Sequence, residues 1–345
     1  MLALALPSAR TNKDFMKPAI YTIAKNEAHN VEGFMQAAEG CPVYVLDTGS
    51  TDKTVELLKE HGAHVVQKII DPWRFDTARN EALALVPDDV DVCVSVDMDE
   101  RLDSGWQDKL QAEWSGNVGS YFYIAEWADE ACTIPSVQSP RTRLHSRHDY
   151  EWHRQIHEVI RPLEGVEQKW CDTSIVVKHY QDGKQRNYSP ALRELLKENP
   201  NDADGWLQLA GECHQVGNFG EALDAYKQYL KVIEGDEREV LRYRRAHTWI
   251  SIAQCLHKLG KTDEVVRAFL SAIAAEPNCR EAWTHFSHIA LQMGNAPLAY
   301  GSAMTAYNIK QPPYHAATEA ACWGELPKEI ADHAFGLIMK QQGNK

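Results

Sequence analysis

The chain has 345 residues, which is enough for two or three domains of ordinary size. Its 44% hydrophobic and 25% charged residues are typical of a folded globular protein and exclude a disordered chain. The formal net charge of -13 disfavours a general nucleic-acid binder, because phosphate backbones are bound by clustered Lys and Arg. A basic pocket for one small phosphorylated ligand stays compatible with this balance. No apolar run approaches the roughly 20 residues that span a bilayer.

The first half of the chain alternates short apolar runs with helical stretches. This order predicts right-handed crossovers and a mostly parallel sheet. From 121 to 177 the strand signals are shorter and rich in aromatic residues, so we expect an α+β extension of the same domain. The expected strands are 19–24, 43–46, 64–66 and 92–96, and the expected helices are 30–38, 53–61 and 77–85.

The second half, from residue 188, contains only helical patterns, in which tryptophan recurs. Trp249 and Trp283 are 34 residues apart. Trp206 lies 43 residues before Trp249, so about nine extra residues are expected near 234–243. With small and large apolar residues in phase with each tryptophan, residues 200–310 resemble tetratricopeptide (TPR) repeats. A final helix over Pro327–Met339, after Pro312–Pro313, is expected to cap the array.

The eight cysteines are scattered, and no two of them form a CxxC pair. This spacing argues against a zinc ribbon or a dithiol redox site. Free thiols are typical of a reducing compartment, so we expect a cytoplasmic protein.

Two acidic clusters follow predicted strands, at the edge of the sheet where α/β proteins bind ligands. Asp47 opens the run Asp-Thr-Gly-Ser-Thr-Asp, which also fits an ordinary turn and helix cap. Asp97, Asp99 and Glu100 follow the fourth strand, and this crowding of carboxylates favours a hard cation such as Mg²⁺ or Mn²⁺. Strand alternation predicts that Asp97 and Asp99 share one side, with Met98 turned away. A solvated acidic loop is the alternative.

Four segments, in this order, resemble family 2 glycosyltransferases, whose catalytic domain has the GT-A fold, a Rossmann-like α/β arrangement. The resemblance covers residues 18–180, and bacterial members of the family with C-terminal TPR repeats have the same layout. The segments are Ile23–Glu27, Leu46–Asp52, Phe75–Leu83 and Val96–Glu100.

The resemblance implies an inverting hexosyltransferase that uses a nucleotide sugar, expected to be a uridine-diphosphate sugar, and Mn²⁺ or Mg²⁺. It implies that Asp99 and His179 hold the metal and that Asp99 takes part in catalysis. Glu158 is the candidate base for the acceptor, with Asp129 and Glu130 as alternatives. The residues expected to contact the donor are Ala24, Glu27, Asp47, Arg79, Asn80, Asp97 and Met98.

Several residues leave choices open. Thr48 stands where the family often has a second acid, so the nucleotide base is not determined. Arg186 could reach the diphosphate or simply precede the next domain. Trp73, Trp127 and Trp152 lie near the four segments and could stack on a sugar or base, although such residues more often lie in the core.

These patterns divide the chain into an N-terminal extension (1–17), a GT-A domain (18–187) and an all-α TPR-like domain (188–345). We expect the repeats to recruit or position an acceptor, which could be a protein, a peptide or a glycan. Nucleic acid is disfavoured, and a homo-oligomer is compatible with the sequence. Two other functions stay open: a TPR scaffold with a degenerate nucleotide-sugar domain, and a nucleotidyltransferase. The intact acids of the fourth strand argue against the first, and the absence of a Gly-rich basic loop argues against the second.

Overall fold

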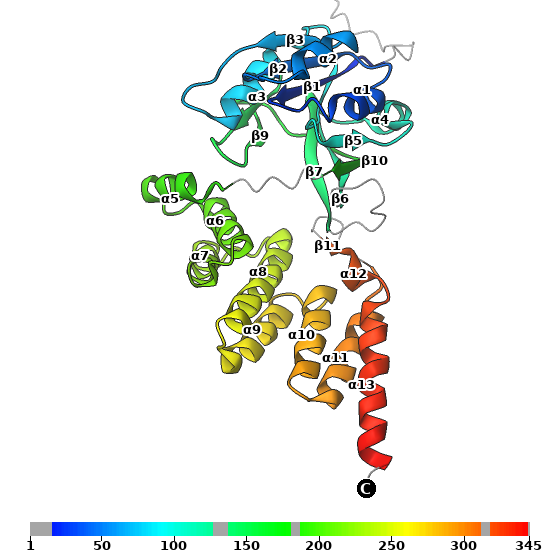
Figure 1. The fold of residues 1–345 in the computed structure, drawn as a ribbon, viewed down its shortest axis with the longest axis vertical. Helices are drawn as coiled ribbons and strands as arrows, with labels where there is room; N and C mark the ends of the chain where they lie inside the picture. Colours follow the sequence, from blue (N-terminus) through cyan, green and yellow to red (C-terminus); the bar gives the residue numbers. More distant parts are fainter. Residues whose placement is uncertain (1–15, 127–136, 181–186, 312–317, 344–345) are drawn as a thin grey trace, which may run out of the picture. The chain divides into compact units, whose positions relative to one another are not determined.

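The structure, a computed structural model, describes residues 16–126, 137–180, 187–311 and 318–343 (Figure 1). It divides into two compact units. The N-terminal unit comprises Met1–Tyr123 and Arg141–Tyr180, and the C-terminal unit comprises Ile124–Pro140 and Gln181–Lys345. Several positions named above lie outside the described residues, namely 1–15 of the expected extension, Trp127, Asp129, Glu130, Arg186 and Pro312–Pro313.

Four parallel strands form one half of the sheet in the N-terminal unit, in the order β3-β2-β1-β4. All four strands and the three helices between them lie within two residues of their predicted bounds. The apolar runs explain this agreement, since a strand buried on both faces reads as a continuous hydrophobic segment. The elements are β1 (Pro18–Ala24), α1 (Val31–Ala37), β2 (Val43–Asp47), α2 (Thr54–Glu60), β3 (His64–Gln67), α3 (Phe75–Ala84) and β4 (Val92–Ser95).

The other half of the sheet corrects the expectation of a mostly parallel arrangement. β4 pairs antiparallel with β7, and the order continues β7-β6-β10-β5, so the sheet is mixed. β10 also pairs antiparallel with β5, so this half of the sheet contains antiparallel neighbours, unlike the β3-β2-β1-β4 half. The remaining elements are β5 (Glu100–Leu102), α4 (Trp106–Glu113), β6 (Val118–Glu126), β7 (Val137–Ser146), the hairpin β8 (Tyr150–His153) and β9 (Val159–Pro162), and β10 (Trp170–Tyr180).

Side chains of β1 alternate between two cores. Ile20 packs in the cluster formed with α1, α2 and α4. Ala19 and Tyr21 pack in a second cluster with α3 and the β8–β9 hairpin. The sheet is therefore covered on both faces at β1.

A chain of hydrogen bonds crosses the second core. Nδ1 of His145 donates to the carbonyl oxygen of Ser146 at 2.9 Å, so Nε2 is left as an acceptor for the Tyr21 hydroxyl at 2.8 Å. The same hydroxyl accepts from Nε1 of Trp152 at 2.6 Å. Each of these buried polar atoms has a hydrogen-bond partner. The three hydrogen bonds therefore fix the neutral tautomer of His145 and hold β8 against β1.

The described part of the C-terminal unit is mainly helical, and its helices pack as successive hairpins (Figure 1). The short strand β11 (Thr318–Glu319) pairs with residues 137–138 of β7. The helices are α5 (Ser189–Glu198), α6 (Ala203–Gln215), α7 (Phe219–Val232), α8 (Glu239–Lys258), α9 (Thr262–Ala275), α10 (Arg280–Gln292), α11 (Ala296–Asn308), α12 (Ala320–Trp323) and α13 (Leu326–Gly343).

The three repeat tryptophans lie on the first helices of three such hairpins. Trp206 and Trp283 are each the fourth residue of their helix, and their indole N–H groups donate to the carbonyls of Pro200 and Pro277 at 2.8 and 2.9 Å. Trp249 is instead the eleventh residue of α8. Most of the extra residues expected between the first two copies therefore lengthen α8 at its N-terminal end.

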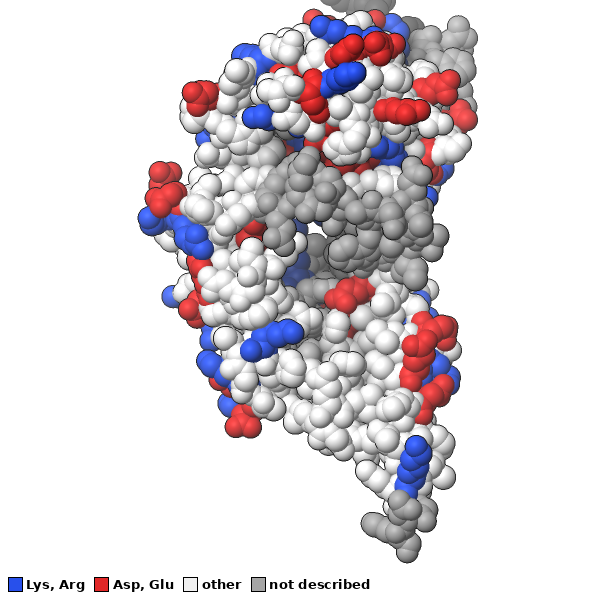
Figure 2. Space-filling view, in the orientation of Figure 1, with Lys and Arg blue, Asp and Glu red and all other residues white. Residues whose placement is uncertain are grey.

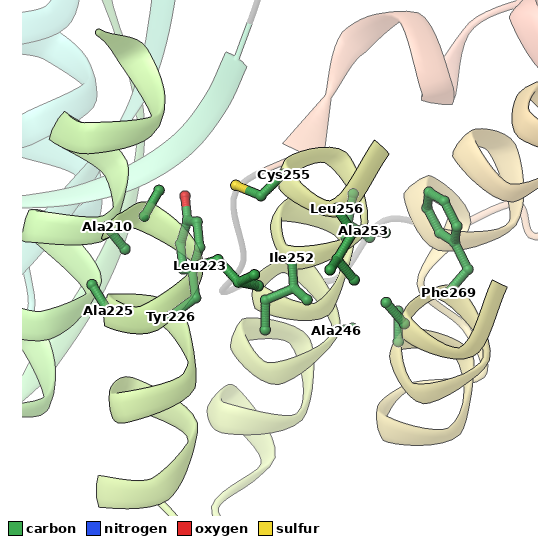
Figure 3. Close-up of a cluster of buried hydrophobic side chains, with 14 of the residues drawn as sticks. Ala210, Leu223, Ala225, Tyr226, Ala246, Ile252, Ala253, Cys255, Leu256 and Phe269 are labelled. Carbon is green, nitrogen blue, oxygen red and sulfur yellow. The ribbon is translucent and has the colours of Figure 1, made fainter. Parts of the chain in front are cut away.

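Small residues let the helices of the repeats approach one another (Figure 3). Ala210, Ala253 and Ala272 are fully buried in one cluster, beside large side chains such as Tyr226 and Phe269. Alanine at a helix contact brings the backbones close, and the neighbouring aromatic ring fills the remaining space. The alternation of small and large residues detected in the sequence is thus the packing rule of this unit.

The last helix, α13, packs on α11 through alanines and covers the final hairpin, as predicted. The helix also carries large apolar side chains that are partly exposed. Phe335 and Met339 are each about half exposed, and the ring of Phe335 lies 5.9 Å from the ring of Tyr300 on α11.

We predict opposite effects for two glycine substitutions in this unit. Gly260 ends α8 with a φ of +73°, and the following N–H donates to the carbonyl of Leu256 at 2.9 Å. Gly260→Ala should therefore lower the free energy of unfolding by roughly 1–2 kcal/mol. Gly301→Ala, in the exposed interior of α11 with open space around it, should raise it by about 0.5–1 kcal/mol. Urea denaturation of both variants measures the difference, and equal effects would contradict the prediction.

We also predict that His145 makes stability depend on pH. Burial lowers the pKa of His145 from 6.5 to about 4, so the unfolded chain takes up this proton at a higher pH than the folded one. Stability is fully present above about pH 6.5 and is lost as the pH falls towards 4, amounting to about 2 kcal/mol between pH 7 and pH 5. Denaturation of the wild type and of His145→Gln at both pH values isolates this effect. A wild type that loses no more stability than the variant would disprove it.

Candidate functional site

The chain turns sharply where β4 ends. The N–H of Glu100 donates to the carbonyl of Asp97 at 3.0 Å, and the N–H of Asp97 donates to Oε2 of Glu100 at 2.8 Å. Glu100 is buried and also accepts from the Tyr121 hydroxyl at 3.3 Å. Burial and the charge of Asp97 raise the pKa of Glu100 to about 7. The third acid of the cluster thus closes the turn and does not reach solvent.

Within this turn, Asp97 and Asp99 remain partly exposed while Met98 is buried. This matches the predicted division of sides, although the cause is the turn and not strand alternation.

Arg79, on α3, joins two carboxylates from distant segments. Its Nη2 donates to Oδ1 of Asp97 at 2.5 Å, and its Nε donates to Oε1 of Glu158 at 2.6 Å. Burial acts to raise the pKa of Asp97, but the charges of Arg79 and Arg143 outweigh it and hold that pKa well below its usual range. Asp97 therefore stays ionised throughout the physiological range.

A second arginine approaches the same group from β7. Nη2 of Arg143 lies 3.5 Å from Oδ2 of Asp97, and Nη1 lies 3.9 Å from Glu158. The guanidinium carbons of Arg79 and Arg143 sit 5.1 and 5.3 Å from the ring centre of Trp152. Trp152 is buried beneath the two cations, so it serves as their platform and not as a surface for a sugar. Trp73, also named above as a residue that could stack on a sugar or base, is 37% exposed.

Asp99 faces a histidine that lies 80 residues later. Nε2 of His179, at the end of β10, is 3.0 Å from Oδ2 of Asp99, and the backbone N–H of Tyr180 donates to the Asp99 carbonyl at 2.8 Å. Burial acts to lower the pKa of His179, but the hydrogen bond and charge of Asp99 raise it overall. Both side chains are partly exposed.

Loops after β1 and β2 bind each other. Asp47 is fully buried, and its carboxylate accepts from the N–H groups of Gly49 and Ser50 at 3.2 and 3.1 Å. The carbonyl of Ala24 accepts from the N–H of Thr48 at 2.9 Å. In the described structure Asp47 therefore shapes its own turn.

Two more residues expected at the donor also have structural partners. The N–H of Glu27 donates to the hydroxyl of Thr54 at 2.8 Å. Asn80 exchanges two hydrogen bonds of 2.8 Å with the backbone of Trp152. Their contacts hold the loop after β1 and the β8 strand in place.

The structure thus gathers Arg79, Asp97, Asp99, Glu158 and His179 around the end of β4. Ala24 and Asp47 are the last residues of β1 and β2, and Glu27 lies in the loop that follows β1. The sequence did not single out Arg143 as a partner of Asp97, or Glu100 and Tyr121 as the buried support of the turn. The spacing of residues in the sequence could not reveal these contacts, because the partners come from strands that pair only in the folded sheet.

Charges of both signs are interspersed on the face of the molecule that Figure 2 shows. No helix in the described part of the chain is both long and apolar enough to cross a membrane.

A family model described as tetratricopeptide repeat matches residues 246–279. The predicted TPR character is therefore confirmed for the hairpin that contains Trp249. No curated protein matches the chain.

Solved structures with a low overall similarity to this chain include the following three. A crystal structure of MamA protein is 17% identical with a TM-score of 0.32, covering 44% of this chain and 78% of that one. A second crystal structure of MamA is 15% identical with a TM-score of 0.32, covering 45% and 89%. The crystal structure of the APC/C hetero-tetramer Cut9–Hcn1 is 13% identical with a TM-score of 0.34, covering 42% and 26%.

We predict that Glu158 stabilises the N-terminal unit through Arg79. Glu158→Ala removes the acceptor of a buried guanidinium N–H and should lower the free energy of unfolding by about 1–3 kcal/mol. The matched control is Glu151→Ala, which removes an exposed carboxylate on the adjacent strand and should change stability by less than about 0.5 kcal/mol. Chemical denaturation of both variants makes the comparison, and similar losses would show that the Arg79 pair is not stabilising.

Proposed function

We propose that the N-terminal unit is a GT-A glycosyltransferase domain that moves a sugar from a nucleotide-sugar donor, with inversion, in a metal-dependent reaction. One observation carries the proposal. Asp97 and Asp99 lie at the carboxyl end of a central parallel strand, and His179 from a distant strand is 3.0 Å from Asp99. Ligands of open α/β sheets bind at this edge.

Asp99 and His179 would hold the divalent metal. The carboxylate of Asp99 is the kind of ligand that Mn²⁺ and Mg²⁺ prefer, and His179 would add an imidazole nitrogen, which suits Mg²⁺ less well. Both side chains are partly exposed, and the remaining positions would go to the diphosphate oxygens of a donor. The metal, when bound, would neutralise charge on the leaving nucleotide diphosphate. No second acid is needed for that departure.

Asp97, Arg79 and Arg143 would line the donor side of the site. The two guanidiniums keep Asp97 ionised, so it can accept hydrogen bonds from ribose or sugar hydroxyls. A uridine-diphosphate sugar is the donor that the resemblance favours. Because the carboxylate of Asp47 is already bonded within its turn, we assign it the role of shaping the loop beside the nucleotide base.

Glu158 would act as the base that accepts a proton from the acceptor. Its Oε1 is bound by Arg79, so Oε2 is the atom assigned to take the proton. The segment before it is unusual, since Arg154 and His157 both have positive φ values of 85° and 52°. Backbone strain of this kind collects at functional sites, where it aims a particular side chain. Asp129 and Glu130 stay as alternative bases.

The helical unit would recruit or position the acceptor, as TPR arrays bind partners on an inner face. Its TPR match supports a protein or peptide acceptor over a glycan. We also propose a cytoplasmic location, which the free thiols of the described cysteines, all buried, support.

The test is donor hydrolysis by the full chain, with Mn²⁺ or Mg²⁺ and with a chelator. We expect slow metal-dependent hydrolysis of a uridine-diphosphate sugar in the wild type. Asp99→Ala should lose it by roughly 100-fold or more, as expected on removing a metal ligand. Asp108→Ala, an exposed carboxylate on α4, should keep it.

Each alternative function predicts another result. A scaffold with a degenerate domain would hydrolyse no donor under any condition. A nucleotidyltransferase would release diphosphate from nucleoside triphosphates instead. Near-normal activity of Asp99→Ala would refute the assignment of the metal site.

A further inference from the structure

A group of metal-binding side chains lies in the C-terminal unit, apart from the acids of the N-terminal unit. Among the described residues, two sets of three potential ligands have their donor atoms within 4.8 Å of one another. Each set combines an imidazole, a thiol and a carboxylate. The sets are His247, Cys279 and Glu281, and His285, Glu319 and Cys322.

The second set has the better geometry. Nε2 of His285 is 2.9 Å from Oε2 of Glu319, and Sγ of Cys322 is 3.7 Å from the same oxygen and 4.0 Å from Nε2. Tetrahedral zinc with bonds of about 2.0 Å to N and O and about 2.3 Å to S separates its ligand atoms by roughly 3.3–3.6 Å. Shifts of about half an ångström, within the reach of small rotations of these side chains, would bring all three atoms to one ion.

The surroundings hold these side chains in place. Cys322 is 1% exposed. Oε1 of Glu281 accepts from the backbone N–H of Glu319 at 3.1 Å and from the indole of Trp323 at 2.6 Å. Glu281 and His285 are one helical turn apart on α10, so both sets anchor β11 and α12 to that helix. The carboxylate of Glu281 therefore orients the backbone that carries Glu319.

The neighbouring set is less well arranged around one ion. Nε2 of His247 is buried and has no hydrogen-bond partner. Such an atom costs free energy unless a ligand or water satisfies it. The thiol of Cys279 points instead to Glu281, 3.7 Å away, and Glu281 is already committed to Glu319 and Trp323. We therefore assign the ion to the set whose three donors all face one another.

The mixture of donors selects the metal. A thiolate and an imidazole are soft and borderline ligands, which favour Zn²⁺ over the hard cations expected at Asp99. We propose that the C-terminal unit binds one Zn²⁺ through His285, Glu319 and Cys322, with water as the fourth ligand. On binding, the thiol and any protonated imidazole release their protons, and the ion ties α12 to α10.

Cobalt substitution of the full chain tests this site. Co²⁺ bound to a thiolate gives a sulfur-to-metal charge-transfer band in the near ultraviolet, which the Asp99 and His179 pair, without sulfur, cannot produce. We expect the band in the wild type and in Cys255→Ala, a matched control that removes another buried thiol. Cys322→Ala and His285→Gln should lose it, and Zn²⁺ affinity measured by competition with a chromophoric chelator should fall roughly 100-fold or more.

Three outcomes would overturn the proposal: no band in the wild type, a band that survives in Cys322→Ala, or one lost only in Cys279→Ala. Circular dichroism checks that each variant keeps its helices. If Cys322→Ala unfolds, His285→Gln decides the question, because it preserves the thiol and replaces only the imidazole. A folded His285→Gln with unchanged zinc affinity would then refute the assignment. Donor hydrolysis is not a readout here, so the result is independent of the proposed transferase activity.

Discussion

The guanidinium of Arg79 is the point on which the candidate site of the N-terminal unit depends. It lies almost fully buried on α3 and binds Asp97 after β4 and Glu158 before β9. A buried cation costs several kcal/mol unless it is well paired, and a buried carboxylate has the same requirement. The three groups therefore stabilise one another, and they hold a helix, a central strand and a hairpin in one arrangement.

This pairing gives three adjacent acids different properties. Asp97 is bound by two arginines and stays ionised. Asp99 is partly exposed beside His179. Glu100 is buried in the turn, with its pKa raised to about 7 by burial and by Asp97. Different environments can give neighbouring carboxyl groups different pKa values, and a protein can in this way obtain several chemical roles from one residue type. Asp97 is thus paired with arginines, Asp99 with a histidine, and Glu100 with backbone and tyrosine groups of the turn.

The C-terminal unit is built on a different rule. Its hairpins pack through alanines beside large side chains, and the lengthened α8 departs from the regular repeat. The polar cluster of His285, Glu319 and Cys322 occurs where α10 meets the segment of β11 and α12, which lies beyond the last repeat hairpin. Two members of the cluster, Glu319 and Cys322, therefore come from outside the repeat hairpins, and His285 comes from the first helix of the last hairpin.

The sequence by itself determined the elements whose signals are local. Apolar runs placed β1 to β4, and the 34-residue spacing of tryptophans placed the helix hairpins, because burial imposes a period on neighbouring residues. The acids after β4 were also recognisable, since a strand that ends in three carboxylates is a local pattern.

Only the tertiary structure decided which side chains meet. The antiparallel half of the sheet, the approach of Arg143 to Asp97 and the burial of Asp47 depend on strand pairing that no local pattern records. Scattered cysteines argued against a zinc ribbon, yet helix packing brings Cys322 within 4.0 Å of a histidine 37 positions earlier. Residues distant in sequence become neighbours through the burial of many other side chains, and the position of each pair is a property of the whole fold.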